Sequence, residues 1–244
     1  MSGVHTLAAH HISKTYQRKT IISDVSVSVS QQEIRGILGP NGAGKSTTFH
    51  VLAGLTSCDQ GTITLDGQDI TNKRLPKRAK MGIAYLPQDA SIFRGLSVQD
   101  NIYSVLELQT HMSKEEKNTI LEGILHQFQL ERIRHTLGTY VSGGERRRVE
   151  VARAIALKPK FVLLDEPFAG IDPVSISEIK HIIIDIKNQG IGIIITDHNV
   201  RETLKICDSA DIMHQGKIIQ SGNAETILND HRVREIYLGK EFSI

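Results

Sequence analysis

Gly39-Pro40-Asn41-Gly42-Ala43-Gly44-Lys45-Ser46 matches the pattern G-x-x-x-x-G-K-[S/T] at every fixed position. An apolar run at residues 34–38 precedes this stretch, and a helical pattern begins at Lys45. A strand, a glycine-rich turn and a helix in this order form a phosphate-binding loop, because backbone N–H groups of the turn and of the helix start point toward the anion. The sequence therefore predicts a nucleotide-phosphate site here.

Each part of this loop has a chemical reason. Glycines let phosphate oxygens approach the backbone, where a Cβ would block them. Lys45 supplies a positive charge for the β- and γ-phosphates, and the hydroxyl of Ser46 is a suitable ligand for Mg²⁺. The predicted nucleotide-binding residues of the loop are Gly39, Pro40, Asn41, Gly42, Ala43, Gly44, Lys45, Ser46 and Thr47.

Apolar runs and helical patterns alternate on both sides of the loop. Residues 34–38, 161–164 and 191–195 are short and apolar on both faces, which is typical of buried parallel strands. Residues 25–30 alternate valine with serine, and residues 62–65 alternate likewise before an Asp-Gly turn, which indicates antiparallel strands. The expected fold class is α/β, with a mostly parallel core sheet and an antiparallel β subdomain at the N-terminus.

The stretch of approximately residues 89–157 has a mostly helical pattern. Ser113 and Glu116 have the spacing of a capping box ahead of Ile120 and Leu121, so a helix is expected to begin at Ser113. We expect this stretch to form a helical subdomain inserted into a single domain that spans residues 1–244.

Two adjacent carboxylates, Asp165 and Glu166, follow the apolar run at residues 161–164. The carboxyl end of a parallel strand lies at the edge of the sheet where ligands bind. Asp165 can then hold Mg²⁺, often through water, and Glu166 can polarise the attacking water. Such a pair alone would indicate an ordinary acidic loop, and the phosphate loop makes it a candidate catalytic site.

A second predicted helix start also carries glycines. Ser142 and Glu145 have capping-box spacing before an apolar helical pattern, and Gly143 and Gly144 stand between them. Two glycines leave backbone N–H groups open to an anion, so Ser142, Gly143 and Gly144 are predicted to contact phosphate. The alternative is a plain capped helix with Arg146-Arg147-Arg148 on a solvated face.

Composition limits the class of protein. The 244 residues include 39% apolar and 23% charged residues, which is typical of a globular protein. The sequence has no apolar run of about 18 residues and no secretory-signal pattern, so a cytoplasmic protein is expected. A net charge of +2 does not indicate nucleic acid as a partner. Cys58 and Cys207 lack metal-ligand spacing and are expected to be free thiols.

In this order, the phosphate loop, Ser142-Gly143-Gly144, Asp165-Glu166 and His198 resemble the ATPase subunits of ABC transporters. The resemblance covers nearly the whole chain, and the Ser-Gly-Gly element separates this family from other phosphate-loop ATPases. It implies the ABC ATPase fold, with a P-loop NTPase core, and ATP and Mg²⁺ as cofactors. It also implies a homodimer in which the Ser142 helix of one subunit closes over ATP bound by the other.

The resemblance gives roles to further residues. Tyr16 resembles the aromatic residue that stacks on adenine, and Gln88 resembles the glutamine that joins the metal site to the helical subdomain. His198 resembles the histidine that contacts the γ-phosphate, so Glu166 and His198 are the implied catalytic pair. Residues 169–172 resemble the loop that touches the partner subunit. The implied Mg²⁺ ligands are Ser46, Gln88 and Asp165.

The helix start at Ser142 departs from the commonest family pattern. Many members carry Leu-Ser-Gly-Gly-Gln, where this chain has Val141 and Glu145. Both variants occur within the family, and Glu145 suits a capping box. We therefore expect activity to be retained.

A narrower resemblance concerns the transported substrate. Residues 166–173 (EPFAGIDP), 195–203 (ITDHNVRET) and 237–242 (YLGKEF) resemble the lipopolysaccharide-export ATPases of Gram-negative bacteria. This implies a peripheral protein on the cytoplasmic face of the inner membrane, where two transmembrane permease subunits move lipopolysaccharide toward the outer membrane. ATPases of branched-chain amino acid importers share much of this pattern and are the alternative.

Two further classes of protein are alternatives. A soluble ABC ATPase acting on nucleic acid or ribosomes would carry a long coiled-coil insertion or a second ATPase domain, whereas this chain has a short gap before Ser142 and one phosphate loop. An inactive paralogue that uses ATP only as a dimerisation switch would not be expected to keep Lys45, Glu166 and His198.

The segment after Gln88 is a candidate contact with the membrane subunits. Phe93 and Arg94 lie between Gln88 and the expected helices, in a stretch of exposed-type sequence. We expect them at the groove that receives a helix of the membrane subunit. A surface loop without a partner is the alternative.

Overall fold

The N-terminal part forms an antiparallel sheet with the strand order β2-β1-β4-β5 in the computed structural model, which describes residues 4–238. The valines of residues 25–30 are buried and the serines between them are mostly exposed, which confirms a half-buried strand. The predicted turn at Asp66-Gly67 joins the antiparallel pair β4 and β5. The strands are β1 (Thr6–Tyr16), β2 (Lys19–Ser30), β4 (Gln60–Leu65) and β5 (Gln68–Asp69).

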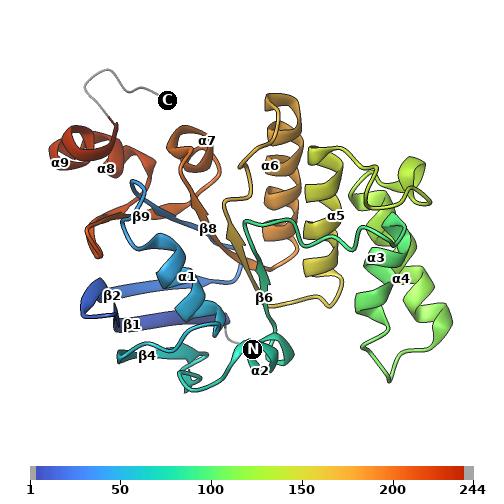
Figure 1. The fold of residues 1–244 in the computed structure, drawn as a ribbon, viewed down its shortest axis with the longest axis horizontal. Coiled ribbons are helices and arrows are strands. Elements are labelled where there is room, and N and C mark those ends of the chain that lie inside the picture. Colours follow the sequence, from blue (N-terminus) through green and yellow to red (C-terminus); the bar gives the residue numbers. More distant parts are fainter. Residues whose placement is uncertain (1–3, 239–244) are drawn as a thin grey trace.

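A second sheet of six strands has the order β10-β9-β3-β8-β7-β6 and forms the centre of the fold (Figure 1). Every pairing in it is parallel except that of β10 with β9, so the predicted, mostly parallel core sheet is confirmed. The strands are β3 (Ile34–Leu38), β6 (Ile83–Leu86), β7 (Phe161–Asp165), β8 (Gly192–Asp197), β9 (Ser209–His214) and β10 (Lys217–Gly222).

Strand β8 differs from its expected bounds of 191–195. It ends at Asp197, because Asp197 continues the ladder by pairing with Leu38 of β3. Strand β7 also runs one residue further than expected, since Asp165 pairs with Thr196. Both predicted strands therefore reach the sheet edge where the phosphate loop begins.

Helices α3 to α6 cover one face of the six-stranded sheet, and helix α1 and the antiparallel sheet cover the other. Phe161 and Leu163 of β7 pack in a core with α1, β1 and β2. Val162 and Leu164 of the same strand pack in a second core with α3 to α6. This double burial is the reason that the sequence of β7 is apolar at every position before Asp165.

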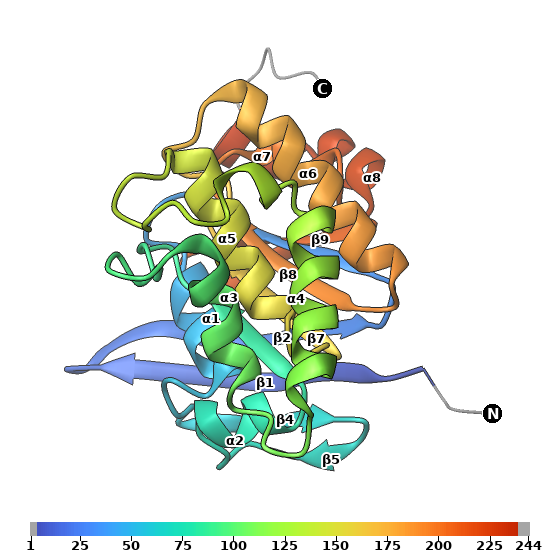
Figure 2. The same ribbon diagram turned by 90° about the vertical axis from the view of Figure 1, so that its right-hand side faces the viewer.

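The three helix starts predicted from capping patterns and the phosphate loop, at Lys45, Ser113 and Ser142, are confirmed. The stretch expected to be mostly helical carries α3, α4 and α5, of which α3 and α4 lie at the end of the molecule away from α8 and α9 (Figures 1 and 2). The helices are α1 (Lys45–Ala53), α2 (Leu75–Lys80), α3 (Val98–Leu106), α4 (Lys114–Gln127), α5 (Gly143–Ile155), α6 (Pro173–Asn188), α7 (Val200–Leu204), α8 (Ala224–Asn229) and α9 (His231–Val233), with a 3-10 turn η1 (Glu131–Ile133) and a π-helical turn η2 (Arg234–Leu238).

The structure also describes the apolar character of the helices and the state of the two cysteines. Within residues 4–238, no helix combines the length and the apolar character that crossing a membrane requires. Cys58 and Cys207 are free thiols, and burial raises the pKa of the Cys207 thiol well above its usual range.

Candidate nucleotide-binding and catalytic site

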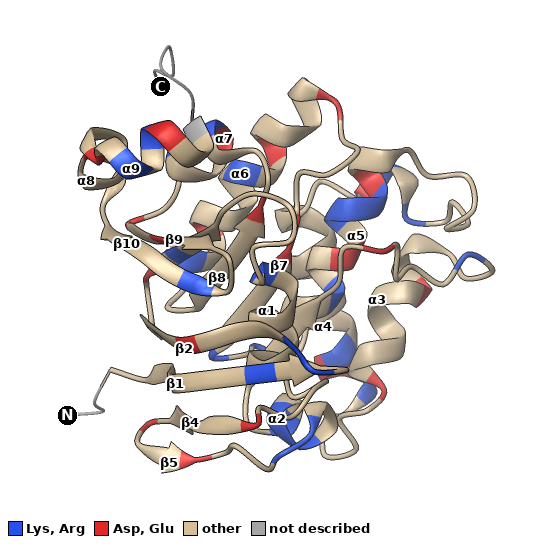
Figure 3. Cartoon of the chain, turned by 60° about the vertical axis from the view of Figure 1, so that its left-hand side comes forward, with Lys and Arg blue, Asp and Glu red and all other residues tan. Residues whose placement is uncertain are grey.

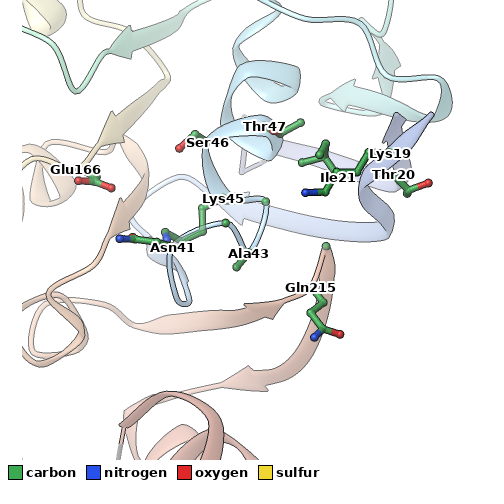
Figure 4. A pocket seen from close by; sticks show the side chains of 13 residues that line it. Lys19, Thr20, Ile21, Asn41, Ala43, Lys45, Ser46, Thr47, Glu166 and Gln215 are labelled. Carbon is green, nitrogen blue, oxygen red and sulfur yellow. The ribbon is translucent and has the colours of Figure 1, made fainter. Parts of the chain in front are cut away.

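Helix α1 begins at the phosphate loop without a side-chain cap. Its N-cap is Gly44, with a φ of 105° in the left-handed region that favours glycine. Residues 41–47 line a pocket of about 620 Å³, together with Lys19, Thr20, Ile21, Glu166, Gln215 and Gly216. Figure 4 shows Glu166 at one end of this pocket and residues 19–21 at the other, with the phosphate loop between them. We call it the phosphate-loop pocket.

Lys45 is the cation that the phosphate loop itself contributes to this pocket, and its side chain lies against the loop. Its Nζ donates to the carbonyl oxygens of Gly39 at 2.8 Å and Pro40 at 3.1 Å. Burial lowers the pKa of Lys45, and the carboxylates of Glu166 and Asp165 act in the opposite direction. Gly39 and Pro40 therefore shape the site through their carbonyl groups, although neither lines the pocket.

Asp165 ends β7 with its side chain almost fully buried. One carboxylate oxygen accepts a hydrogen bond from the Thr196 hydroxyl at 2.5 Å, and the other accepts from the Tyr85 hydroxyl at 3.3 Å. Burial and Asp165 together raise the pKa of Tyr85 well above its usual range, so Tyr85 stays a donor. Each carboxylate oxygen keeps further acceptor capacity for a cation.

The donor set suits Mg²⁺ that is shared with a nucleotide. Residues 4–238 contain no group of three or more His, Cys, Asp or Glu side chains placed to hold a metal alone. Mg²⁺ usually binds through one or two carboxylates together with substrate phosphates and water, so Asp165 and the hydroxyl of Ser46 fit this ion. The third predicted ligand, Gln88, instead donates its amide to Glu166.

Two predicted functional residues, Gln88 and His198, converge at a third, Glu166. Its Oε2 atom accepts from Nε2 of Gln88 at 3.0 Å and lies 3.1 Å from Nδ1 of His198. Glu166 also has a φ of 44°, an uncommon value for a non-glycine residue that often marks a functional site. The geometry therefore brings the predicted base, the γ-phosphate histidine and the linking glutamine together at the pocket.

Asp197 anchors this arrangement and was not identified from the sequence. Its two carboxylate oxygens accept from the backbone N–H groups of Asn199 at 2.7 Å and Phe168 at 3.3 Å. It therefore ties the loop after Glu166 to the loop that carries His198. Burial raises the pKa of Asp197. The feature of the sequence that could have identified Asp197 is its position at the end of an apolar strand.

The helix start at Ser142 is capped by its own side chains. The Ser142 hydroxyl accepts from the Glu145 N–H at 3.3 Å, and Glu145 accepts from the Ser142 N–H at 2.8 Å. None of the described residues that line the phosphate-loop pocket comes from 142–144. Gly143 lines a separate small hollow together with Gln88 and Glu166.

Helix α5 also holds the segment that follows β6. Arg147 donates to the carbonyl oxygens of Pro87 at 3.0 Å and Asp165 at 3.1 Å. Glu150 accepts from the N–H of Ser91 at 2.6 Å. Figure 3 shows basic residues along α5, and the alternative of a solvated arginine face is wrong for Arg147, which is buried. Burial lowers the pKa of this guanidinium.

Tyr16 does not line the phosphate-loop pocket. It ends β1 and borders a separate hollow with Lys14 and Leu55, where the Lys14 ammonium lies 5.4 Å from the ring centroid. The end of the phosphate-loop pocket away from Glu166 is lined instead by Lys19, Thr20 and Ile21, at the start of β2.

The C-terminal segment packs beside the phosphate loop. Tyr237 contacts the core that contains Leu38 and Val200, and its hydroxyl is buried without a hydrogen bond. Burial raises its pKa to about 12, and the nearby backbone of Gly39 acts in the opposite direction. Within the predicted YLGKEF ending, residues 239–242 lie outside the described residues.

Comparisons with known proteins show the family to which the chain belongs. The family model for ABC transporters matches residues 22–169. The chain is 50% identical over 238 residues to the lipopolysaccharide export system ATP-binding protein LptB of Haemophilus influenzae, covering 98% of this chain and 99% of that protein. It is 48% identical over 239 residues to LptB of Escherichia coli K12, with coverages of 98% and 99%.

Solved structures agree as well. The ADP conformation of MJ1267, an ATP-binding cassette of an ABC transporter, has a TM-score of 0.86 and 28% identity, and the match covers 98% of this chain and 100% of that one. The predicted fold class is thereby confirmed.

Proposed function

Because this chain belongs to the ABC transporter family of ATP-binding proteins, we propose that it is the ATP-hydrolysing subunit of a lipopolysaccharide exporter. The observation that carries hydrolysis is the Glu166 carboxylate, which lines the phosphate-loop pocket and contacts both Gln88 and His198. The lipopolysaccharide substrate is inferred from near full-length relatives that are 50% and 48% identical. ATP hydrolysis then powers extraction of lipopolysaccharide from the inner membrane toward the outer membrane.

The proposed chemistry is hydrolysis of the γ-phosphate of ATP. Lys45 neutralises negative charge on the β- and γ-phosphates, and Glu166 orients and polarises the attacking water. Mg²⁺ held by Ser46 and Asp165 would neutralise the remaining charge. His198 lies within hydrogen-bonding distance of Glu166, so both side chains can meet the same phosphate. Catalysis of this kind rests on positioning and electrostatics rather than on covalent chemistry.

A homodimer completes the proposed site. Residues 142–144 do not reach the phosphate-loop pocket of their own chain, so a second copy has to supply them. ATP then joins two subunits, because the partner's helix start adds donors to the γ-phosphate, and hydrolysis removes that link. Charge-assisted hydrogen bonds of this type contribute about 1.5–3 kcal/mol each. The loop at 169–172, which ends at the α6 cap Asp172, would lie at the same interface.

An exposed apolar patch is the proposed contact with two transmembrane permease subunits. Phe93, Leu96, Leu137 and Tyr140 are exposed by 49%, 38%, 41% and 77%. Backbone hydrogen bonds from Gly138 and Thr139 hold the two loops that carry them together. Exposed apolar patches on soluble surfaces mark interaction sites. The chain would therefore sit on the cytoplasmic face of the inner membrane through these subunits.

Helix α5 connects this patch to the site. Arg153 places its guanidinium 4.4 Å from the centroid of the Phe93 ring and donates to the Ser91 carbonyl at 2.5 Å. Arg147 on the same helix holds Pro87, the residue before Gln88. Movement of the Ser142 helix is therefore expected to move Gln88 and the patch together.

Replacing Glu166 by Gln tests hydrolysis. The purified transporter complex should bind ATP and lose steady-state phosphate release, because the amide cannot accept a proton from water. Glu225→Gln, which changes an exposed carboxylate on α8, is the matched control and should retain activity. Equal turnover of the wild-type and Glu166→Gln complexes would rule out this assignment and restore the inactive-paralogue alternative.

Charge reversal tests the permease contact. Arg94→Glu should reduce co-purification of the membrane subunits and the ATPase activity that they stimulate. Arg132→Glu, another exposed arginine between β6 and β7, should leave both unchanged. Intact assembly with Arg94→Glu would remove Arg94 from the proposed contact.

Native purification tests the substrate. A tagged chain extracted from its own membranes in mild detergent should bring two membrane subunits and bound lipopolysaccharide, identified by mass spectrometry. Recovery of permeases that pair with an amino-acid-binding protein would indicate the importer instead. Recovery of nucleic acid with steep salt dependence would indicate a soluble ABC ATPase.

A further inference from the structure

The turn between β9 and β10, residues 214–217, lies directly against the phosphate loop. The backbone N–H of Gly216 donates to the carbonyl oxygen of Ala43 at 2.9 Å. The carbonyl oxygen of Gly216 accepts from the N–H of Ser23 in β2 at 2.8 Å. One residue therefore links the phosphate loop to the antiparallel sheet. It lies outside residues 22–169, which the family model matches.

Only glycine fits at position 216. Its φ of 78° lies in the left-handed region, and a Cβ there would approach the carbonyl oxygen of Ile21 to 2.4 Å. That oxygen belongs to the backbone of β2, so it cannot rotate away as a side chain can. A larger residue would have to push the turn away from β2, and the hydrogen bond to Ala43 would lengthen.

The strand before this turn supports the same loop. A Cβ on Gly39 would come within 2.2 Å of the carbonyl oxygen of Met213, so the two backbones are in close contact. The hydroxyl of Thr48 in α1 donates to the sulfur of Met213 at 3.7 Å. Both ends of the phosphate loop therefore rest on β9 and its turn.

The bond to Ala43 affects the direction of a phosphate donor. In a planar trans peptide, a carbonyl group and the following N–H point in opposite directions. Because Gly216 draws the Ala43 carbonyl toward the 214–217 turn, the N–H of Gly44 is directed away from that turn. Gly44, Gln215 and Gly216 all line the phosphate-loop pocket. Figure 4 shows Gln215 on the side of this pocket away from Glu166.

We infer that the 214–217 turn holds the phosphate loop in its anion-binding shape, and that Gly216 is a positioning residue for nucleotide binding that acts through Ala43. This inference rests on the proposed function, since it concerns the same ATP site. The ligand class is a nucleoside triphosphate, and the turn contributes backbone hydrogen bonds to the loop instead of a side chain to the ligand.

Gly67 provides a matched control for this role. It lies in the β4–β5 turn with a φ of 76°, and a Cβ there would meet nothing within 4 Å. Gly216→Ala and Gly67→Ala therefore both place alanine at a similar left-handed φ, whereas only the first introduces a clash beside the phosphate loop. Purified wild-type chain and both variants are titrated with a fluorescent ATP analogue and Mg²⁺, and their thermal unfolding is recorded.

Gly216→Ala should weaken binding of the ATP analogue at least about tenfold relative to Gly67→Ala, which should bind as wild type does within about twofold. The tenfold limit corresponds to a difference in binding free energy of about 1.4 kcal/mol between the two variants. Equal affinity of the two variants would overturn the role of Gly216 and leave the proposed function intact. A wild-type chain that bound no ATP analogue would overturn both.

If Gly216→Ala does not fold, hydrogen exchange on the wild-type chain tests the role of Gly216 instead. Adding the ATP analogue should slow exchange of the Gly216 amide together with amides of residues 41–47, and leave the Gly67 amide unchanged. An unaltered Gly216 amide in the presence of bound nucleotide would overturn the inference.

Discussion

Two helices of this chain begin at predicted phosphate contacts, and their N-termini are satisfied in different ways. Helix α1 has Gly44 as its N-cap, so no side chain occupies its first N–H groups. Helix α5 has Ser142 as its N-cap, and a capping box with Glu145 satisfies two of its N–H groups. Helix α1 can therefore bind an anion with its own chain alone, whereas α5 offers a phosphate only the donors that its capping box leaves free.

The glycines at the two helix starts also differ. A Cβ on Gly144 would lie 2.2 Å from Oγ of Ser175 in α6, while a Cβ on Gly143 would have its nearest contact at 3.8 Å. Packing against α6 therefore explains Gly144 without any ligand. The argument from sequence that two glycines indicate an anion site applies to Gly143, whose surroundings are open.

Removing Lys45 should produce the largest difference between the two helix starts. Lys45→Ala takes away the cation beside the α1 donors, and ATP hydrolysis should fall about 10²- to 10³-fold. Phosphate release by the purified complex is the measurement. Lys80→Ala, at the exposed end of α2, is the control. Activity within threefold of wild type in Lys45→Ala would remove α1 as the principal phosphate site.

Gly144→Ala should have the next largest effect, on stability. The added methyl group overpacks the contact with Ser175, so the free energy of unfolding should fall by about 1–3 kcal/mol in urea denaturation. Gly143→Ala should cause no loss. The double variant Gly144→Ala/Ser175→Gly should recover part of the stability. A Gly144→Ala variant as stable as Gly143→Ala would contradict the packing explanation.

Ser142→Ala should cost about 1 kcal/mol of stability, because a capping hydroxyl is lost. Ser113 caps α4 with the same capping box, so Ser113→Ala should cost a similar amount. Only Ser142→Ala should also reduce ATP hydrolysis, since α5, unlike α4, is proposed to meet a phosphate. If both variants hydrolyse ATP at the wild-type rate, the proposed phosphate contact of α5 is wrong and Ser142 only caps the helix.

Glu145→Gln should have the smallest effect. Glutamine keeps both hydrogen bonds of the capping box, so the free energy of unfolding should change by less than about 0.5 kcal/mol. ATP hydrolysis should be unchanged or higher, because a negative charge near the partner's phosphate is removed. A tenfold loss of hydrolysis would show that the carboxylate of Glu145 has a function beyond capping.

Local sequence patterns predicted a large part of this fold and site. The phosphate loop, the capping boxes at Ser113 and Ser142, and strands β3 and β7 are signals within a dozen residues, and the structure confirms each. The resemblance to ABC ATPases then placed Gln88 and His198, which do meet at Glu166. Short patterns succeed because caps, turns and strand periodicity depend on neighbouring residues.

Contacts between distant residues were not predictable in this way. Gly216 bonds to Ala43, Gly144 packs on Ser175, and Tyr16 borders a hollow that is separate from the phosphate-loop pocket. The sequence by itself determined the candidate phosphate-binding residues and which carboxylates follow strand β7. Only the tertiary structure decided what supports them, because the position of Gly216 depends on the pairing of β9 with β3, and no local period in the sequence encodes that register.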